Sequence, residues 1–385
     1  MPRFNPILDQ LPAYPFVELD RRKAALKAAG RPVFDFSKGD PVEPTPEFIR
    51  EAMVAAVEPS CPYPAVAGGD DVRHAISEYL ARRFGVEVDP HRGILPTAGS
   101  KEAVFHAPLL VIDPQADDKL VIFPDPGYPA YERGALFAGG EPYAAPLSGD
   151  HVFRPWLLPE AVLRRARMMW INSPHNPSGA VTGLDDLKRT VALCQQYDIL
   201  LMSDETYADI YTEGTEPPRS ALEVSQEGVL ALHSLSKRSG MTGYRSGFLA
   251  GDPALIRRNR ELRANPGLVP QDFINAAAAV AWRDDAHVAE RRQLFSAKKA
   301  VLLSLFREQG YEVIGESATI YLWLRVPVAG LSDADYAESL LEAGIVVSPG
   351  SMLGLTEAGR GWVRLAMVPS LSECAAAVAA WRSLL

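Results

Sequence analysis

Short apolar runs alternate with stretches of helical periodicity between residues 93 and 250. The runs are rich in Val, Ile, Leu and Met, a composition typical of strands that are buried on both faces. Strands of this kind separated by helices predict a largely parallel sheet that is covered on both sides. The expected strands are 93–97, 119–123, 168–172, 199–203, 229–233 and 247–250, and the expected helices between them are 100–111, 128–137 and 184–197.

The chain on either side of this pattern has a different character. After about residue 281 a long charged helix is followed by short alternating strands, which predicts a smaller α+β unit. The expected domains are an N-terminal extended arm (1–17), a small domain (18–45 and 281–385) and a large domain (46–280). The elements expected outside the large sheet are helices 16–29, 46–57, 283–309, 333–343 and 371–385, a helix capped by Asp70 or Asp71 and running to Phe84, and strands 34–36, 311–314, 320–325, 345–348 and 362–366.

Composition narrows the class of protein. The chain has 385 residues, of which 47% are hydrophobic and 23% charged, so it can bury a sizeable core in about two domains. The net charge of −9 argues against nonspecific nucleic-acid binding and against an anionic membrane surface. The three cysteines are far apart, no metal-ligand spacing occurs, and neither a secretory signal nor an apolar run of membrane-spanning length is present. We therefore expect a cytoplasmic protein without a metal site.

Two common phosphate-binding motifs are missing from the sequence. Neither GxxxxGK[ST] nor GxGxxG occurs between a strand and a helix, which removes the main support for nucleotide hydrolases and Rossmann dehydrogenases. Lysine is scarce, with nine in the whole chain. Only Lys101 and Lys237 follow expected strands, where ligands of parallel sheets bind. The backbone N–H groups of Ser100 and Lys101, at the start of a helix, can bind an anion.

The segment 232–251 carries the richest chemistry. Ser234, Ser236 and Lys237 follow an expected strand, and Arg245 lies eight residues beyond the lysine among several glycines. Hydroxyl groups and a guanidinium can converge on a phosphate. A lysine in such surroundings can have its pKa lowered and attack a carbonyl to form a Schiff base. An ordinary surface turn with a solvated lysine is the competing interpretation of this segment alone.

Five further residues occupy positions where chemistry is expected, and each also has a structural interpretation. Asp204 can neutralise a protonated pyridine ring, or cap a helix. Tyr207 can donate a hydrogen bond to a phenolate oxygen, and Tyr128 can stack on a flat ring, or both can pack in a core. Asn176 is held in a loop by two prolines and a glycine, or is part of a tight turn. Arg364 interrupts an apolar strand and needs a carboxylate, from the protein or from a substrate.

In their order along the chain, these residues resemble the fold-type I pyridoxal-phosphate aminotransferases of classes I and II. The resemblance covers essentially the whole chain: SLSK with Arg245, SDETY and NSPHNPSG match the motifs of the family. It implies a mostly parallel seven-stranded sheet in a large domain, a smaller α+β domain, and a homodimer with shared active sites. It implies pyridoxal 5′-phosphate as cofactor, with an amino acid and a 2-oxo acid as substrates.

The resemblance also implies a role for each matching residue. Lys237, Asp204 and Tyr207 would be catalytic, and Gly39, Asn176 and Arg364 would bind substrate. Tyr63 would reach the phosphate bound by the neighbouring subunit. The residues that would contact the cofactor are Ser100, Lys101, Tyr128, Asn176, Asp204, Tyr207, Ser234, Ser236, Lys237 and Arg245, with Tyr63 from the partner.

Within this family, stretches such as YPAVAGGDDVRHAI and YLWLRVP resemble N-succinyldiaminopimelate aminotransferases of lysine biosynthesis. The expected reaction is therefore transfer of an amino group between N-succinyl-LL-2,6-diaminopimelate and 2-oxoglutarate. Two departures bear on the substrate: SGMTGYRSGF stands where these relatives have SNVPGLRSGF, and the segment 263–271, expected to line the substrate pocket, diverges. The alternatives are an aminotransferase for aspartate, aromatic amino acids or LL-diaminopimelate, a C–S β-lyase, and a non-enzymatic regulator with this fold.

Overall fold

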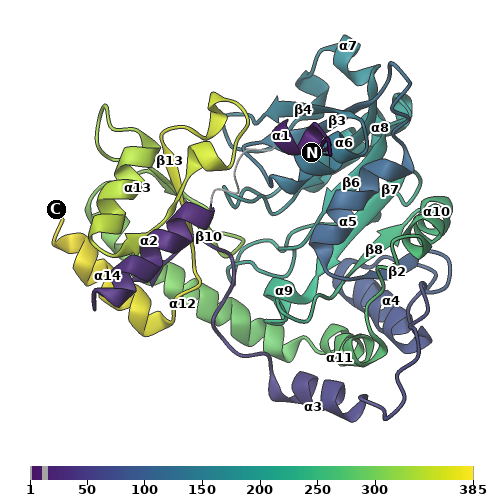
Figure 1. Ribbon diagram of the computed structural model, residues 1–385, viewed down its shortest axis with the longest axis horizontal. Helices are drawn as coiled ribbons and strands as arrows, with labels where there is room; N and C mark the ends of the chain where they lie inside the picture. The colour runs from purple at the N-terminus through teal and green to yellow at the C-terminus, as the bar shows by residue number, and fades with distance from the viewer. Residues whose placement is uncertain (1, 11–15, 385) are drawn as a thin grey trace.

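The computed structural model describes residues 2–10 and 16–384. In Figure 1 a large sheet with its helices lies on the right, a smaller α/β part lies on the left, and α12 (Ala286–Glu308) runs between them. Part of the predicted N-terminal arm, residues 11–15, lies outside the described residues. Its earlier part was predicted to be extended, but it contains a short helix, α1 (Ile7–Gln10).

The large sheet has seven strands, and all but one are parallel. β8 runs antiparallel to both of its neighbours. This confirms the mostly parallel sheet that the alternating pattern predicted. In spatial order the strands are β2 (Ile94–Thr97), β8 (Gly247–Gly251), β7 (Val229–Ser234), β6 (Leu200–Asp204), β5 (Ala166–Asn172), β3 (Leu120–Asp125) and β4 (Glu141–Pro146).

The helices around this sheet include several that the sequence pattern did not indicate. The expected helix at 283–309 corresponds to α12, whereas α11, which ends at Arg283, was not predicted; the chain is extended at Asp284 between the two helices. The N-cap of α4 is Gly69, and Asp70 and Asp71 lie in the first turn instead of capping it. The helices are α3 (Glu47–Ala55), α4 (Asp70–Phe84), α5 (Ser100–His106), α6 (Ala130–Phe137), α7 (Glu160–Leu163), α8 (Leu184–Gln196), α9 (Leu235–Arg238), α10 (Pro253–Ala264) and α11 (Asp272–Arg283).

The smaller part is built on a four-stranded antiparallel sheet and a separate parallel pair. The single strand expected at 345–348 is two short strands, one in each sheet. The four-stranded sheet consists of β12 (Ser348–Pro349), β13 (Trp362–Ala366), β10 (Tyr321–Arg325) and β9 (Val313–Ile314), the pair consists of β1 (Phe34–Asp35) and β11 (Ile345–Val346), and the helices are α2 (Phe16–Ala28), α12, α13 (Asp333–Glu342) and α14 (Leu371–Arg382).

Alternate residues of the large sheet face two different apolar clusters. Met169 and Ile171 of β5 belong to one cluster, and Met168 and Trp170 belong to the other. The first cluster includes side chains of α4, α8 and α11, and the second includes side chains of α5, α6 and α10. Because side chains of a strand alternate between faces, this arrangement explains why the strands are apolar throughout. A third cluster forms the core of the smaller part and also includes Tyr207, next to β6.

Two lysines of α12 that we interpreted as part of a charged helical surface are buried. Lys298 forms an ion pair with Glu43, and Lys299 donates hydrogen bonds to the carbonyls of Gly315 and Ala318, at 2.5 and 2.7 Å. Burial lowers the pKa of Lys299 to about 7. Both amines therefore join segments of the smaller part to each other. Among the described residues, no helix is long and apolar enough to cross a membrane.

Candidate active site

A cavity of about 910 Å³ lies at the carboxyl ends of the central strands, between the large sheet and the smaller part. Parallel sheets bind ligands at this edge. Most of the predicted site residues line the cavity. They are Gly39, Ser100, Lys101, Tyr128, Asn176, Asp204, Tyr207, Ser236, Lys237, Arg245 and Arg364.

The cavity contains an amine with a lowered pKa. Lys237 follows β7 on the short helix α9, and its Nζ donates a hydrogen bond to the Gly39 carbonyl. Burial lowers the pKa of Lys237 to about 8; Asp40 acts to raise it, and Arg245 and Arg364 lower it further. A substantial fraction of this amine is therefore neutral near pH 8, as a nucleophile or a general base requires.

Asp204 is buried where β6 ends, and two donors hold its carboxylate. Tyr131 Oη donates to Oδ2 at 2.7 Å, and the Thr206 N–H donates to Oδ1 at 3.2 Å. Burial raises the pKa of Asp204, whereas hydrogen bonds from Tyr131 and Thr206 lower it. The Tyr131 ring stacks on Trp170 with a centroid distance of 4.7 Å. Sequence reasoning missed Tyr131, which lies in the first turn of α6, three residues after Tyr128.

Two asparagines connect the end of β6 to Arg364. Asn172 Nδ2 donates to the carbonyl of Asp204 at 2.9 Å, and Asn172 Oδ1 accepts from the Asn176 N–H at 2.8 Å. The Asn176 side chain in turn accepts a hydrogen bond from Arg364 Nη1 at 2.8 Å. Arg364 Nη2 donates to the Ser37 carbonyl, also at 2.8 Å. The guanidinium is thus oriented by neutral acceptors, and no described carboxylate pairs with it.

Tyr207 meets a second tyrosine that sequence reasoning did not identify. The hydroxyls of Tyr207 and Tyr321 are 2.8 Å apart, and burial raises the pKa of Tyr207 well above its usual range. Tyr321 also lies under the Arg364 guanidinium, 4.5 Å from its ring centroid. A Cβ on residue 39 would clash with the Tyr321 hydroxyl, so Gly39 is required by this close approach. Tyr321 lies within the YLWLR strand, where an apolar pattern predicts only core packing.

One side of the cavity is rich in hydrogen-bond donors. Arg245, with a left-handed backbone (φ 56°), places its guanidinium against Gly99, where a Cβ would clash with it. Ser100 and Lys101 begin α5, and a helix offers no acceptors to the N–H groups of its first turn. Ser236 also lines the cavity, whereas Ser234 does not: its Oγ accepts from the Ser236 N–H at 3.1 Å and caps α9.

Two sequence expectations fall outside the cavity of this chain. Tyr63 is fully exposed and does not line it, so its predicted contact with a neighbouring subunit stays a prediction. The divergent segment 263–271, expected to line the pocket, does not line it either. Arg263 instead points inward and is buried, where it pairs with Glu102 at 2.6 Å and donates to the Pro96 carbonyl at 2.8 Å.

The donor set fits a phosphorylated pyridine aldehyde. The cradle of Gly99, Arg245, Ser236 and the first turn of α5 suits a phosphate, and the buried Asp204 carboxylate suits a protonated ring nitrogen. Tyr128 offers an aromatic face, and Lys237 offers an amine. No group of three or more side chains suited to a metal ion occurs within residues 2–10 and 16–384.

Fold and cavity together define the class: an enzyme of the α/β type with a site for pyridoxal 5′-phosphate. The model of the family described as aminotransferase class I and II matches residues 31–380, and the chain belongs to this family. Its members depend on pyridoxal phosphate, which confirms the predicted family, fold class and cofactor.

Individual relatives cover almost the full length of the chain. The LL-diaminopimelate aminotransferase of Aquifex aeolicus (strain VF5) is 36% identical over 372 residues, which are 94% of each chain. The crystal structure of an aminotransferase from Neisseria meningitidis Z2491 has a TM-score of 0.91 and 32% identity, over 99% of this chain and 100% of that one. A structure from Thermus thermophilus, described as a probable N-succinyldiaminopimelate aminotransferase, has a TM-score of 0.88 and 26% identity, over 96% of this chain and 100% of the other.

Proposed function

We propose that this aminotransferase transfers an amino group between LL-2,6-diaminopimelate and 2-oxoglutarate. The observation that carries this choice is the relative from Aquifex aeolicus, which is named for the unblocked donor and matches 94% of both chains. Because of this similarity we propose the unblocked donor instead of the N-succinyl donor, which the sequence motifs favoured. Both donors belong to diaminopimelate and lysine biosynthesis, so the proposed pathway is the same.

Each residue of the cavity has a proposed task. When bound, pyridoxal phosphate supplies an electron-withdrawing ring that stabilises negative charge developing at the substrate Cα. The neutral Lys237 amine would remove the proton from the Cα of the donor and would deliver a proton to the Cα of the glutamate that forms from 2-oxoglutarate. Asp204 would keep a proton on the ring nitrogen, and Tyr207 and Asn176 would donate hydrogen bonds to the phenolic oxygen of the ring. Tyr128 stacks on the ring and thereby fixes its plane.

The anchoring groups keep the reacting atoms in place. Arg245, Ser236 and the first turn of α5 hold the phosphate, and Ser234 contributes by capping α9. Arg364 would bind the α-carboxylate bidentately, with Gly39 beside it, and would thereby orient the Cα–H bond of the substrate. We further propose that residues 18–45 and 281–385 form one domain and that residues 46–280 form another. The two domains meet at this cavity.

Transfer from N-succinyl-LL-2,6-diaminopimelate is the second candidate. It is favoured by the Thermus thermophilus structure, at 26% identity, and by the motifs YPAVAGGDDVRHAI and YLWLRVP. Activity on aspartate or aromatic donors and C–S β-elimination are further alternatives, of which β-elimination would release pyruvate and ammonia without a 2-oxo acid. A regulator without activity is disfavoured, because every predicted catalytic position is occupied and lines the cavity.

A donor panel with 2-oxoglutarate tests the proposal. Glutamate formation should be fastest with LL-2,6-diaminopimelate and should disappear in Lys237→Ala, because that variant lacks the amine that moves the proton. Borohydride treatment of the holoenzyme should fix the cofactor on Lys237 of the wild type and leave none attached in the variant, as mass spectrometry would detect. Faster transfer from N-succinyl-LL-2,6-diaminopimelate would favour the second candidate, and unchanged turnover in Lys237→Ala would refute the role of this lysine.

A further inference from the structure

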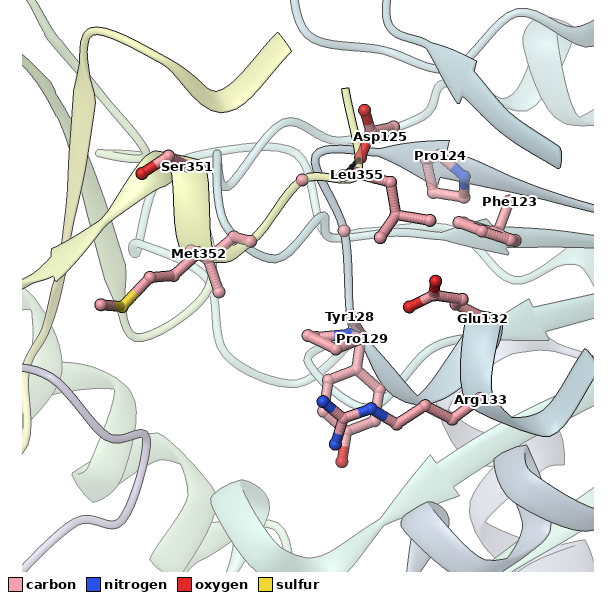
Figure 2. A pocket seen from close by; sticks show the side chains of 13 residues that line it. Phe123, Pro124, Asp125, Tyr128, Pro129, Glu132, Arg133, Ser351, Met352 and Leu355 are labelled. Carbon is pink, nitrogen blue, oxygen red and sulfur yellow. Dashed lines mark hydrogen bonds between the residues drawn. The ribbon is translucent and has the colours of Figure 1, made fainter. Parts of the chain in front are cut away.

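A second, smaller cavity of about 280 Å³ adjoins the main one. The two share Tyr128, Pro129, Arg133 and Leu353 in their walls. As Figure 2 shows, the smaller cavity lies between the segment 123–133, where β3 leads into α6, and the segment 351–355 of the smaller part. We call it the side pocket. None of the proposed catalytic steps takes place in the side pocket, although Tyr128, which is proposed to stack on the cofactor ring, belongs to the walls of both cavities.

The side pocket combines an apolar wall with charged groups of both signs. Consecutive residues of α6, Glu132 and Arg133, supply a carboxylate and a guanidinium. A further acid in the wall, Asp125, is already engaged, since it accepts from the Leu355 N–H at 2.7 Å, from the Thr356 N–H at 3.0 Å and from the Thr356 hydroxyl. The apolar part of the wall is formed by Phe123, Pro124, Met352, Leu353 and Leu355.

Glu132 is the informative group. Its carboxylate is partly buried and makes no hydrogen bond or ion pair with any residue in the described ranges 2–10 and 16–384. Burial raises the pKa of Glu132, while Arg133 lowers it and Asp125 raises it further. Figure 2 shows the carboxylate directed from α6 into the space between Leu355 and Tyr128. A carboxylate withdrawn from water in a cavity is compensated when a cation binds beside it.

We propose that the side pocket binds the distal end of the amino donor, with Glu132 pairing with a distal ammonium and Arg133 with a distal carboxylate. The ligand class is thus a zwitterionic amino-acid group joined by a short apolar chain to the reacting end. This inference rests on the proposed function and specifies its substrate. An N-acylated donor lacks the distal positive charge, and a succinyl group would bring an additional carboxylate towards Glu132. The pocket therefore favours the unblocked donor.

Donors that differ only at the distal end test this assignment. The holoenzyme is assayed with LL-2,6-diaminopimelate, with N-succinyl-LL-2,6-diaminopimelate and with 2-aminopimelate, which keeps the distal carboxylate but has no distal ammonium. In Glu132→Gln, KM for LL-2,6-diaminopimelate should rise about tenfold, since a hydrogen bond between charged partners is lost. KM for 2-aminopimelate should stay the same. In Arg133→Gln, KM should rise both for LL-2,6-diaminopimelate and for 2-aminopimelate, because both donors carry the distal carboxylate.

The control is Glu160→Gln, which removes an exposed carboxylate on α7 that pairs with Arg164, away from both cavities. It should change KM for none of the donors. Unchanged KM for LL-2,6-diaminopimelate in Glu132→Gln, or an equal rise for 2-aminopimelate, would overturn the side-pocket assignment while leaving the proposed function intact. A wild type that does not use LL-2,6-diaminopimelate but transfers from another donor would overturn the proposed donor, and this assignment with it.

Discussion

At the scale of single residues, the site depends on side chains that support other side chains. Tyr131 and Tyr321 are such residues, because each hydroxyl bonds to a proposed catalytic group, Asp204 or Tyr207. Neither could be identified from the sequence, because an aromatic residue in an apolar helix or strand is equally compatible with core packing. Lys237, Asp204 and Arg364 could be predicted as candidates, because charged residues at the ends or in the middle of apolar strands need a partner; all three line the cavity.

Removing the Tyr131 hydroxyl should weaken cofactor binding without altering the shape of the cavity. In Tyr131→Phe, Asp204 loses its hydrogen bond of 2.7 Å, so the pKa of Asp204 rises further and its carboxylate holds the protonated ring nitrogen less firmly. At about 1 kcal/mol for one buried hydrogen bond, the dissociation constant for pyridoxal phosphate should increase about fivefold. Cofactor titration followed by protein fluorescence would measure it.

Tyr79→Phe is a matched control for this measurement. Tyr79 is also a buried tyrosine, and its hydroxyl donates to Asp209 Oδ2 at 3.0 Å, outside the cavity. Both variants should lose comparable thermal stability, but only Tyr131→Phe should lose cofactor affinity. Equal cofactor affinity in the two variants would show that Tyr131 is merely a structural residue.

At the scale of secondary structure, the periodicity of the chain predicted six of the seven strands of the large sheet and missed one edge strand, β4. β4 was missed because Pro142 and Pro146 interrupt it and because it is a half-exposed edge strand, paired only with β3. α11 was not predicted, whereas α12 lies close to the helix expected at 283–309. Lys298 and Lys299 were misjudged, since sequence alone does not distinguish a solvated lysine from a buried one that bonds to Glu43 or to carbonyl oxygens.

The elements around Lys237 are joined by a buried charge network centred on Asp209. Its carboxylate accepts from Arg83 of α4 at 3.0 Å and from Arg238 of α9 at 2.7 Å. Arg238 also donates to the Ala281 carbonyl of α11 at 2.6 Å. Burial acts to raise the pKa of Asp209, but Arg238 and Arg83 outweigh it and lower the pKa to about 2. The short helix that carries Lys237 is therefore held by ion pairs that depend on an ionised Asp209.

This network predicts a specific acid dependence of stability. Because the pKa of Asp209 is about 2 in the folded chain and 3.8 ordinarily, its contribution is complete above pH 4 and is lost as the pH falls towards 2. That contribution amounts to about 2 kcal/mol of the free energy of unfolding. Asp209→Asn should be less stable than the wild type at pH 7, and the difference should shrink between pH 4 and pH 2 in urea titrations. A difference that does not change with pH would contradict this account.

At the scale of the whole molecule, the cavity is closed from two sides by segments far apart in the sequence. The large sheet supplies Lys237 and Asp204, while the smaller part supplies Gly39, Tyr321 and Arg364. The sequence order of the motifs was enough to predict this fold, because the strand-end residues of a parallel sheet converge on one edge. The hydrogen-bond partners of the individual side chains could not be predicted, because bonds such as that from Arg364 to Ser37 join residues more than 300 positions apart.

One predicted site residue, Tyr63, is exposed in a single chain, and the role predicted for it requires a dimer. We expect a homodimer in which Tyr63 completes the phosphate site of the partner, so that each site needs Lys237 from one subunit and Tyr63 from the other. Tyr63→Ala and Lys237→Ala should each be nearly inactive as homodimers. After the two are mixed, unfolded and refolded together, each heterodimer has one site with both defects and one intact site. About a quarter of wild-type activity should then return, if subunits pair at random in a two-fold dimer.

The same mixing experiment can contradict the prediction in two ways. Full activity in Tyr63→Ala homodimers would show that the hydroxyl and ring do not reach a site at all. Inactive mixtures, with heterodimers demonstrated by differently tagged subunits, would place Tyr63 and Lys237 in the same site of one chain. That second outcome would require the segment around Tyr63 to fold over its own cavity, where the structure instead leaves Tyr63 exposed. Recovery on mixing is therefore the result that the exposed position of Tyr63 and the cavity of this chain jointly support.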